Sequence, residues 1–326
     1  MARRRSAWRA LGLFWVVVLL VLGGGAVALQ VMGPARNEVA AAPHDVPAHS
    51  PEPPAPPVPA PGIARPDPAL LERAPGFPQL MLPRVVDRRA ARTVYAAPVP
   101  TAPAGAKRVA LLLGSFGGSE KDSRTAIETL PGPVSFAVSA YTANAAGPLL
   151  EAARFAGHEL LVSVPMEPDG YPLNDEGTRS LRTGLSPEEN RTNLVWSLGQ
   201  TQGAVGATGA SDGMRGERFA GLPASFDPVV EEILRRGLLY VDPRPGVATQ
   251  PGARSVDLVI DDSQARAEIE GRLAALERIA REKGSAIGLA GQLRPVTLDR
   301  IAAWSQGLAA RGMVLVPVSS LVEEPR

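Results

Sequence analysis

Short apolar runs alternate with helical patterns over the C-terminal two thirds of the chain. Runs rich in Val, Leu, Ile and Ala that are bounded by Gly, Pro and polar residues are typical of buried strands. These runs predict strands over 108–113, 134–139, 159–164, 204–207, 238–241, 255–260, 286–290 and 314–316. Apolar residues at helical spacing predict helices over 121–129, 145–156, 227–236 and 296–310, with two more that start after 186 and 263.

This alternation is typical of a parallel sheet covered by helices. We therefore predict the α/β class, as an irregular (β/α) barrel of seven to eight parallel strands within a domain over 105–326. The helix start at Ser186-Pro187-Glu188-Glu189 has the form of a capping box. In such barrels functional residues lie at the carboxyl ends of the strands, so candidate chemistry is sought there.

A basic cluster followed by an apolar run opens the chain. Four arginines stand among residues 1–9, which we expect to be cytoplasmic. Residues 10–33 carry no charge and are long enough for a membrane-spanning helix, which needs about 20 residues. We expect a single-pass anchor in the inner (cytoplasmic) membrane, with the C-terminal domain on the extracytoplasmic, periplasmic side.

A cleavable signal peptide is the alternative for this segment. Gly23–Gly25 interrupt the helix signal, and Ala26-Val27-Ala28 matches a small-x-small cleavage site. Both interpretations export the rest of the chain.

Residues 34–104 are dominated by Pro and Ala, which predicts an extended linker without a core of its own. His44 and His49 fall in this linker, where we expect them to be solvated. The apolar content rises over 77–82 and 94–95, so this part of the linker is a candidate for packing along the domain.

The supply of metal-binding side chains is small. The chain has three histidines and no cysteine, which leaves His158 as the only histidine of the predicted domain. Zinc sites are normally built from several His or Cys ligands. A formal net charge of +1 with no clustered basic face argues against nucleic acid as a partner.

Several short segments, in this order, resemble the divergent polysaccharide deacetylase family, relatives of the carbohydrate esterase barrels that remove acetyl groups from glycans. The segments are Leu130-Pro131-Gly132-Pro133-Val134, Ala156-Gly157-His158-Glu159, Val164-Pro165-Met166-Glu167-Pro168, Gly203-Ala204-Val205-Gly206, Arg236-Gly237-Leu238, Lys283-Gly284-Ser285-Ala286-Ile287 and Val316-Pro317-Val318-Ser319. The resemblance covers about residues 107–322, and it implies a barrel with a metal-dependent hydrolytic site at the strand ends.

The positions that carry the family's chemistry are substituted in this chain. The family's Asp-Asp pair after the first strand, base and metal ligand, is replaced by Gly114-Ser115. Ser163 stands where a histidine usually precedes Pro-Met-Glu-Pro. Gly213 replaces the histidine of an Asn-Asn-His-Met segment, and Gly291 that of a Gly-His pair. Because glycine and serine supply neither imidazole nor carboxylate, we expect no zinc or other divalent metal and no cofactor.

A few polar residues remain as candidates for binding a ligand in the cleft. Asp242 ends the fifth strand, and the alternative to ligand binding is an ion pair with Arg244. Glu167 either fixes its loop or contacts a ligand, and Asp212 and Tyr171 are further cleft candidates.

The pair Asp261-Asp262 could share a metal ion. The simpler interpretation is that it leads into the helix that follows, where acidic residues favour the positive N-terminal end.

The sequence therefore predicts an exported, membrane-tethered, deacetylase-like domain that is non-catalytic and binds a cell-envelope glycan or an envelope protein. The alternative is an active metal-dependent deacetylase, a hydrolase of C–N bonds in N-acetyl sugars, with carboxylates such as Asp242, Glu167, Asp261 and Asp262 as rewired ligands.

Overall fold

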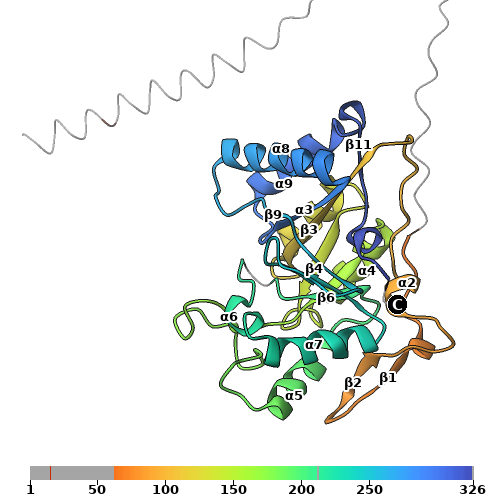
Figure 1. Cartoon of the computed structure of the whole chain (residues 1–326), viewed down its shortest axis with the longest axis vertical. Coiled ribbons are helices and arrows are strands. Elements are labelled where there is room, and N and C mark those ends of the chain that lie inside the picture. Colours follow the sequence, from red (N-terminus) through yellow and green to blue (C-terminus); the bar gives the residue numbers. More distant parts are fainter. Residues whose placement is uncertain (1–14, 16–61, 211–212, 325–326) are drawn as a thin grey trace, which may run out of the picture. The chain divides into compact units, whose positions relative to one another are not determined.

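A curled parallel sheet forms the centre of the molecule, as seen in the computed structural model, which describes Trp15 and residues 62–210 and 213–324 (Figure 1). Its strands are β3 (Lys107–Phe116), β4 (Ser135–Ser139), β5 (Leu160–Ser163), β6 (Gly206–Thr208), β7 (Leu239–Asp242), β8 (Ala253–Ser255), β9 (Leu258–Val259), β10 (Ser285–Ala290) and β11 (Met313–Leu315). The order is β8-β7-β6-β5-β4-β3-β10-β9, β11 pairs with the first residues of β3, and every pair is parallel. This confirms the α/β class with a parallel sheet.

The two edges of this sheet are joined by only two residues. β8 ends at Ser255 on one edge and β9 begins at Leu258 on the other, so the edges lie within about 10 Å of each other along the chain. Val256 N donates to Asp242 O on the β7 side, and Asp257 N donates to Ile287 O on the β10 side. The sheet therefore curls almost into a barrel.

This arrangement corrects the single strand predicted over 255–260. The segment instead forms two short strands on opposite edges, because successive residues bond to different neighbours. No ladder joins β8 to β9 among the described residues, so the sheet is curled and its backbone pairing is not closed.

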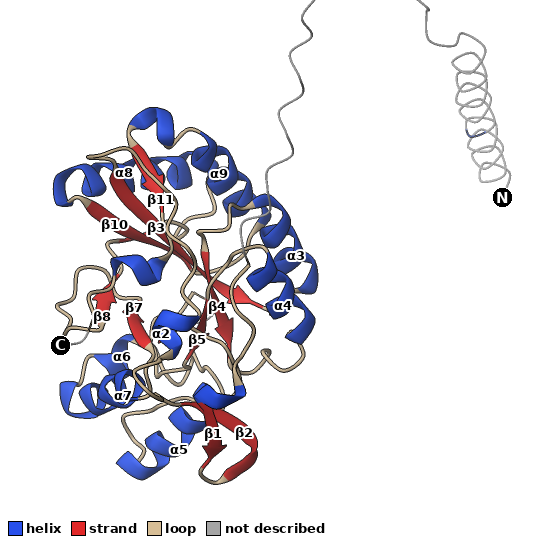
Figure 2. Cartoon of the chain, turned by 90° about the vertical axis from the view of Figure 1, so that its right-hand side faces the viewer, coloured by secondary structure: helices blue, strands red, loops and turns tan. Residues whose placement is uncertain are grey.

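Helices surround the sheet on its outside (Figure 2). They are α3 (Glu120–Thr129), α4 (Gly147–Phe155), α5 (Pro187–Leu198), α6 (Glu217–Ala220), α7 (Pro223–Arg235), α8 (Arg266–Lys283) and α9 (Pro295–Gln306). The capping box predicted at the start of α5 is confirmed, because Ser186 Oγ accepts from Glu189 N and the Glu189 carboxylate accepts from Ser186 N. α7 begins at Pro223, earlier than predicted, and Pro228 lies inside it.

The chain before β3 is also folded from residue 62 on, although it was assigned to the linker. It contains the short 3-10 turn Pro68–Leu70, the hairpin of β1 (Leu71–Ala74) and β2 (Phe77–Pro83), and α2 (Ala91–Val94). We call residues 62–97 the strap. Buried strap residues pack in one cluster with side chains of β5, α5 and α7.

Polar contacts fix the strap as well as apolar ones. The Tyr95 ring is buried and its hydroxyl accepts from Asp67 N at 2.8 Å. Arg92 N donates to Gly237 O at 2.9 Å, beside the end of α7. The folded domain thus begins before the predicted boundary at 105, since apolar strap residues at 63, 70, 82 and 95 complete its core.

Glu159, which has no ion-pair partner among the described residues, links the strap to two other segments of the domain. Glu159 is fully buried and accepts from Ala97 N at 3.3 Å, Ser135 Oγ at 2.8 Å and Ser319 N at 2.9 Å. These donors come from the strap, from β4 and from the 3-10 turn Val318–Leu321. Burial raises the pKa of Glu159, and its hydrogen bonds offset part of that rise.

The predicted cytoplasmic segment and the predicted anchor over 10–33 lie outside the described residues, apart from Trp15. Within the described part of the chain, none of the helices combines the length and the apolar character needed to cross a bilayer.

Removal of the strap is expected to destabilise the domain. A fragment over 105–326 loses the buried side chains of Leu70, Leu82 and Tyr95, which lowers the free energy of unfolding by about 4 kcal/mol or more relative to a fragment over 62–326. Urea unfolding followed by circular dichroism measures the difference. Equal midpoints for the two fragments would show that the strap adds no stability.

The buried Glu159 predicts a pH dependence of stability. Its folded-state pKa lies above the ordinary value of 4.5, so the folded chain binds more protons than the unfolded chain between these two values. The stability it contributes is fully present below 4.5 and is lost as the pH rises through the folded-state pKa. Urea midpoints measured across this window should fall more steeply with rising pH in the wild type than in Glu159→Gln, and parallel curves would contradict the assignment.

Candidate functional site

The carboxyl ends of β3 and β10 meet backbone to backbone at the mouth of the curled sheet. Ala290 pairs with Leu113, and the next residues are Gly291 and Gly114. A Cβ atom on Gly114 would lie 2.6 Å from Gly291 O, closer than real Cβ contacts come. Ser115 Oγ donates to the same oxygen at 2.9 Å, with Ser115 at φ 58°.

A third glycine joins these two from the loop after β6. A Cβ on Gly291 would lie 2.9 Å from the Cα atom of Gly213, which adopts φ 86°. The resemblance places ligands of a metal ion at these positions. Backbone now occupies the space that longer side chains would need, so this part of the mouth has lost both the donors and the room for them.

Ser163 ends β5 and is buried. Its hydroxyl has no hydrogen-bond partner among the described residues. A serine hydroxyl at this position supplies no imidazole. With Ser163, all five substituted positions lie at the carboxyl ends of strands or in the loops that follow them.

Asp261 fixes the loop between β10 and α9. Its carboxylate accepts from Gly291 N at 2.7 Å and from Gln292 N at 3.1 Å, and Arg294 Nη1 donates to its backbone oxygen at 3.2 Å. Asp262 instead pairs with Arg215 at 3.3 Å. The two carboxylates therefore have separate structural contacts. The predicted reason was wrong, because Asp261 binds loop amides of another segment and not the start of α8.

Glu167 lies buried in the loop after β5. One carboxylate oxygen accepts from Thr183 N at 2.6 Å and Thr183 Oγ1 at 2.8 Å, and the other pairs with Arg218 Nε at 3.0 Å. These contacts link the loop after β5 to Thr183 and Arg218. They occupy both carboxylate oxygens of Glu167.

Asp242 is paired with Arg244, as its alternative interpretation predicted. The carboxylate accepts from Arg244 Nη2 at 2.6 Å and Nε at 3.0 Å, while Arg244 Nη1 donates to Ala220 O at 2.7 Å. Burial, with the Asp242 charge nearby, holds the pKa of the Tyr240 hydroxyl well above its usual range, so that Tyr240 stays protonated.

The remaining two cleft candidates differ in what the structure describes. Tyr171 is half-buried and its hydroxyl accepts from Arg182 Nη1 at 2.9 Å. Asp212 lies outside the described residues.

The retained carboxylates do not form a common site for a cation. The carboxylates of Asp242, Glu167 and Asp261 each accept hydrogen bonds from a different set of protein donors. In the described ranges, no group of three or more His, Cys, Asp or Glu side chains is placed to hold a metal ion. Among the described residues, the donor set does not fit a divalent ion, which needs about three protein ligands in a catalytic site.

A polar pocket of about 270 Å³ opens beside the three glycines, and we call it the mouth pocket. It is lined by Asn174, Ala210, Gly213, Met214, Arg215, Val259, Asp261, Asp262, Leu289, Gly291, Gln292 and Arg294. Among the described residues of its lining, the charged groups are two arginines and two aspartates.

Sequence reasoning missed Arg215, Gln292, Arg294 and Asn174. The first three lie within a few residues of Gly213 and Gly291, at strand ends that the barrel rule had already singled out. Asn174 belongs to the loop after β5, and only tertiary folding brings it to the pocket.

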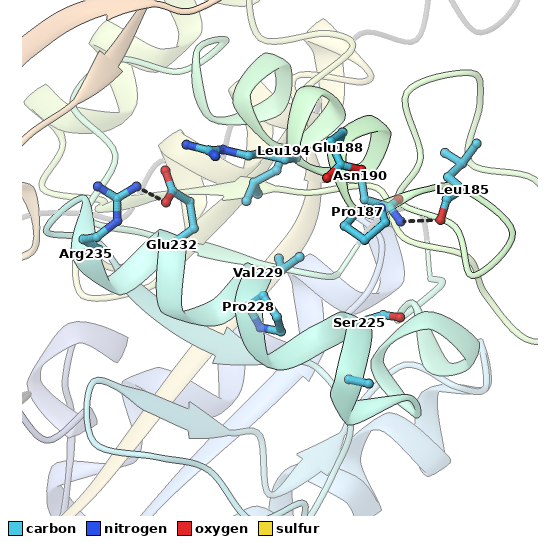
Figure 3. A pocket seen from close by; sticks show the side chains of 12 residues that line it. Leu185, Pro187, Glu188, Asn190, Leu194, Ser225, Pro228, Val229, Glu232 and Arg235 are labelled. Carbon is cyan, nitrogen blue, oxygen red and sulfur yellow. Dashed lines mark hydrogen bonds and ion pairs between the residues drawn. The ribbon is translucent and has the colours of Figure 1, made fainter.

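A larger groove of about 490 Å³ lies between α5 and α7, away from the mouth (Figure 3). Three of its polar side chains have partners within the chain. Asn190 Nδ2 donates to Arg182 O at 2.9 Å, and Arg235 pairs with Glu232. The groove has volume, but it lacks a group placed for chemistry.

The comparisons with known proteins point to one family. The model of the divergent polysaccharide deacetylase family matches residues 111–322. An uncharacterized protein from Agrobacterium tumefaciens C58 is 31% identical, with 74% of this chain and 100% of that chain covered and a TM-score of 0.68. None of the curated proteins matches the chain.

Two solved enzymes share the fold only remotely. The catalytic domain of a peptidoglycan N-acetylglucosamine deacetylase from Eubacterium rectale ATCC 33656 is 14% identical, with 71% of this chain and 97% of that chain covered and a TM-score of 0.44. A family 4 carbohydrate esterase from Streptomyces lividans is 13% identical, with 68% and 98% covered and a TM-score of 0.42.

The close approach at the mouth predicts that Gly114 tolerates no side chain. Gly114→Ala should lower the free energy of unfolding by about 1–3 kcal/mol, because its methyl group would overlap Gly291 O. Gly271→Ala in α8 is the matched control, since a Cβ there meets nothing within 4 Å, and it should stabilise by about 0.5–1 kcal/mol. Thermal unfolding measures both, and a neutral Gly114→Ala would show that the mouth is open.

Proposed function

Because the chain belongs to the divergent polysaccharide deacetylase family, we propose that it is a non-catalytic member that binds a cell-envelope glycan in the mouth pocket. The domain acts on the extracytoplasmic side, tethered by the N-terminal segment to the inner membrane. The protein would bind the same class of ligand as the family's enzymes, a glycan, without deacetylating it.

The backbone contact between Gly114 and Gly291 carries the non-catalytic part of this proposal. A hydrolytic site needs a base for the attacking water and ligands for the ion that activates it. A carboxylate at 114 would have to displace Gly291 O, and an imidazole at 291 would have to displace Gly213. Restoring the chemistry therefore requires movement of three loops as well as new side chains.

The lining of the mouth pocket supports a glycan as the ligand. Arg215, Arg294 and Asn174 carry further N–H groups besides those that bind Glu217, Asp262, Asp261 O and Asp169 O, and Asp262 supplies carboxylate acceptors. Sugar hydroxyls are both donors and acceptors, so a lining that mixes donors and acceptors suits a polyhydroxylated chain. No cofactor or divalent metal has a part in this binding.

The tether and the export are argued from the sequence. The arginines among residues 1–9 and the apolar run over 10–33 favour a retained span with the domain outside the cytoplasm. The Pro-rich segment that follows gives the domain reach into the envelope.

The binding part is tested with the full chain in detergent and insoluble peptidoglycan sacculi. We expect the wild type to cosediment with sacculi, and Arg215→Ala to bind about tenfold more weakly because it loses a charged hydrogen-bond donor. Arg235→Ala, an arginine of the groove between α5 and α7, is the matched control and should bind as the wild type does. Wild-type protein that stays in the supernatant with every polysaccharide offered would leave an envelope protein as the ligand.

The non-catalytic part is tested by acetate release. The same protein, supplied with zinc, magnesium or calcium, should release no acetate from N-acetylated polysaccharide, and purified protein should hold no stoichiometric divalent metal. Acetate release together with a metal that is lost in Asp261→Asn or Asp242→Ala would establish the enzyme alternative.

A further inference from the structure

A tyrosine on the rim of the barrel has no part in the mouth pocket. Tyr141 lies two residues beyond the carboxyl end of β4 and is 44% exposed. β4 neighbours β3, so Tyr141 stands on the same edge of the sheet as Gly114 and Ser115. Its own loop packs against the loop after β3, where a Cβ on Gly117 would meet Ala146 at 2.9 Å.

The Tyr141 ring is held in one orientation. Its hydroxyl accepts from Arg179 N at 2.8 Å, and the ring packs on Trp196 of α5 with centroids 5.0 Å apart. Gly177, at φ 95°, lets the loop pass so close that a Cβ there would lie 2.7 Å from the hydroxyl. An exposed aromatic ring fixed in this way loses little conformational freedom when it binds a ligand.

A second layer supports the ring from below. The Arg179 guanidinium lies 5.9 Å from the centre of Trp196 and 5.3 Å from that of Phe77. Phe77 belongs to β2 and Trp196 to α5, so the strap, α5 and the loop after β5 meet at the Arg179 side chain. Burial raises the pKa of the Tyr141 hydroxyl, which therefore stays neutral and keeps accepting from Arg179.

We propose that Tyr141 is a stacking subsite for a pyranose ring, and that it extends the glycan site from the mouth pocket along the rim. This inference rests on the proposed function, because it assigns a second contact to the same glycan. The C–H face of a pyranose is apolar and buries well on the face of an aromatic ring.

The surroundings of the Tyr141 ring favour a sugar over an apolar protein surface as its ligand. The Tyr141 hydroxyl accepts from Arg179 N, and the exposed Asp175 belongs to the same loop, so polar groups lie near the hydroxyl end of the ring. These groups suit the equatorial hydroxyls around a pyranose ring. An apolar protein surface would have to desolvate the exposed Asp175 carboxylate.

The loop over 168–182 connects the two contacts. Asn174 of this loop lines the mouth pocket, and Arg179 of the same loop binds the Tyr141 hydroxyl. A glycan strand that leaves the mouth pocket along the loop therefore arrives at Tyr141. Several sugar units, and not a single monosaccharide, are the ligand this geometry suits.

The test uses the full chain in detergent, peptidoglycan sacculi, and soluble hexamers of N-acetylglucosamine, glucose and xylose, with calorimetry for the hexamers. We compare Tyr141→Leu, which removes the ring, with Tyr141→Phe, which keeps the ring and removes the hydroxyl bond to Arg179. Phe155→Ala is the matched control, since Phe155 is an exposed aromatic residue at the end of α4. Circular dichroism confirms that each variant is folded.

For the glycan that binds, we expect Tyr141→Leu to weaken the affinity about tenfold or more, Tyr141→Phe to stay within about threefold, and Phe155→Ala to match the wild type. The loss of affinity caused by Tyr141→Leu should be larger for a hexamer than for a dimer of the same sugar. Equal affinity of Tyr141→Leu and wild type, with Arg215→Ala still weak, would overturn the subsite and leave the proposed function intact. Equal losses of affinity in Tyr141→Leu and Tyr141→Phe would show that Tyr141 only holds its loop in place, which would overturn the subsite. A wild type that binds no probe would overturn both proposals.

Discussion

The approach of two backbones at the ends of β3 and β10 constrains everything at the mouth of this domain. The parallel pairing of these strands continues to Leu113 and Ala290, and the residues that follow are glycines that bring a carbonyl oxygen to 2.6 Å from a would-be Cβ. Ser115 and Asp261 then bind the atoms of Gly291, so the closed arrangement is held from two sides. A single substitution cannot reopen a site that is filled by main chain.

A second set of contacts between distant segments surrounds Glu159, at the opposite end of the sheet. Glu159 is buried with hydrogen-bond donors and no cation, and those donors come from three segments distant in the sequence. A buried carboxyl group held only by neutral donors fixes geometry at some cost in stability at neutral pH. It joins the strap to the barrel, and Phe77 of the strap contacts the Arg179 guanidinium, which also lies against Trp196.

The retained carboxylates show how far sequence carries a site prediction. The pairing of Asp242 with Arg244 was predictable because the partners are two residues apart, whereas the partners of Glu167, at Thr183 and Arg218, come from other segments. Asp261 was assigned a structural role for the wrong reason, since its partners are thirty residues away at Gly291 and Gln292. Asn174 reaches the mouth pocket only because a long loop folds back over the strand ends.

The sequence by itself determined the parallel α/β class, most strand positions and the loss of imidazole and carboxylate donors at the strand ends. These features are local, because they follow from the period of apolar residues and from which side chains stand at given positions. Only the tertiary structure decided that residues 255–260 divide between two sheet edges, that the chain from residue 62 belongs to the core, and that glycine backbones fill the mouth. Those outcomes depend on contacts between segments far apart in the chain, which composition and periodicity do not encode.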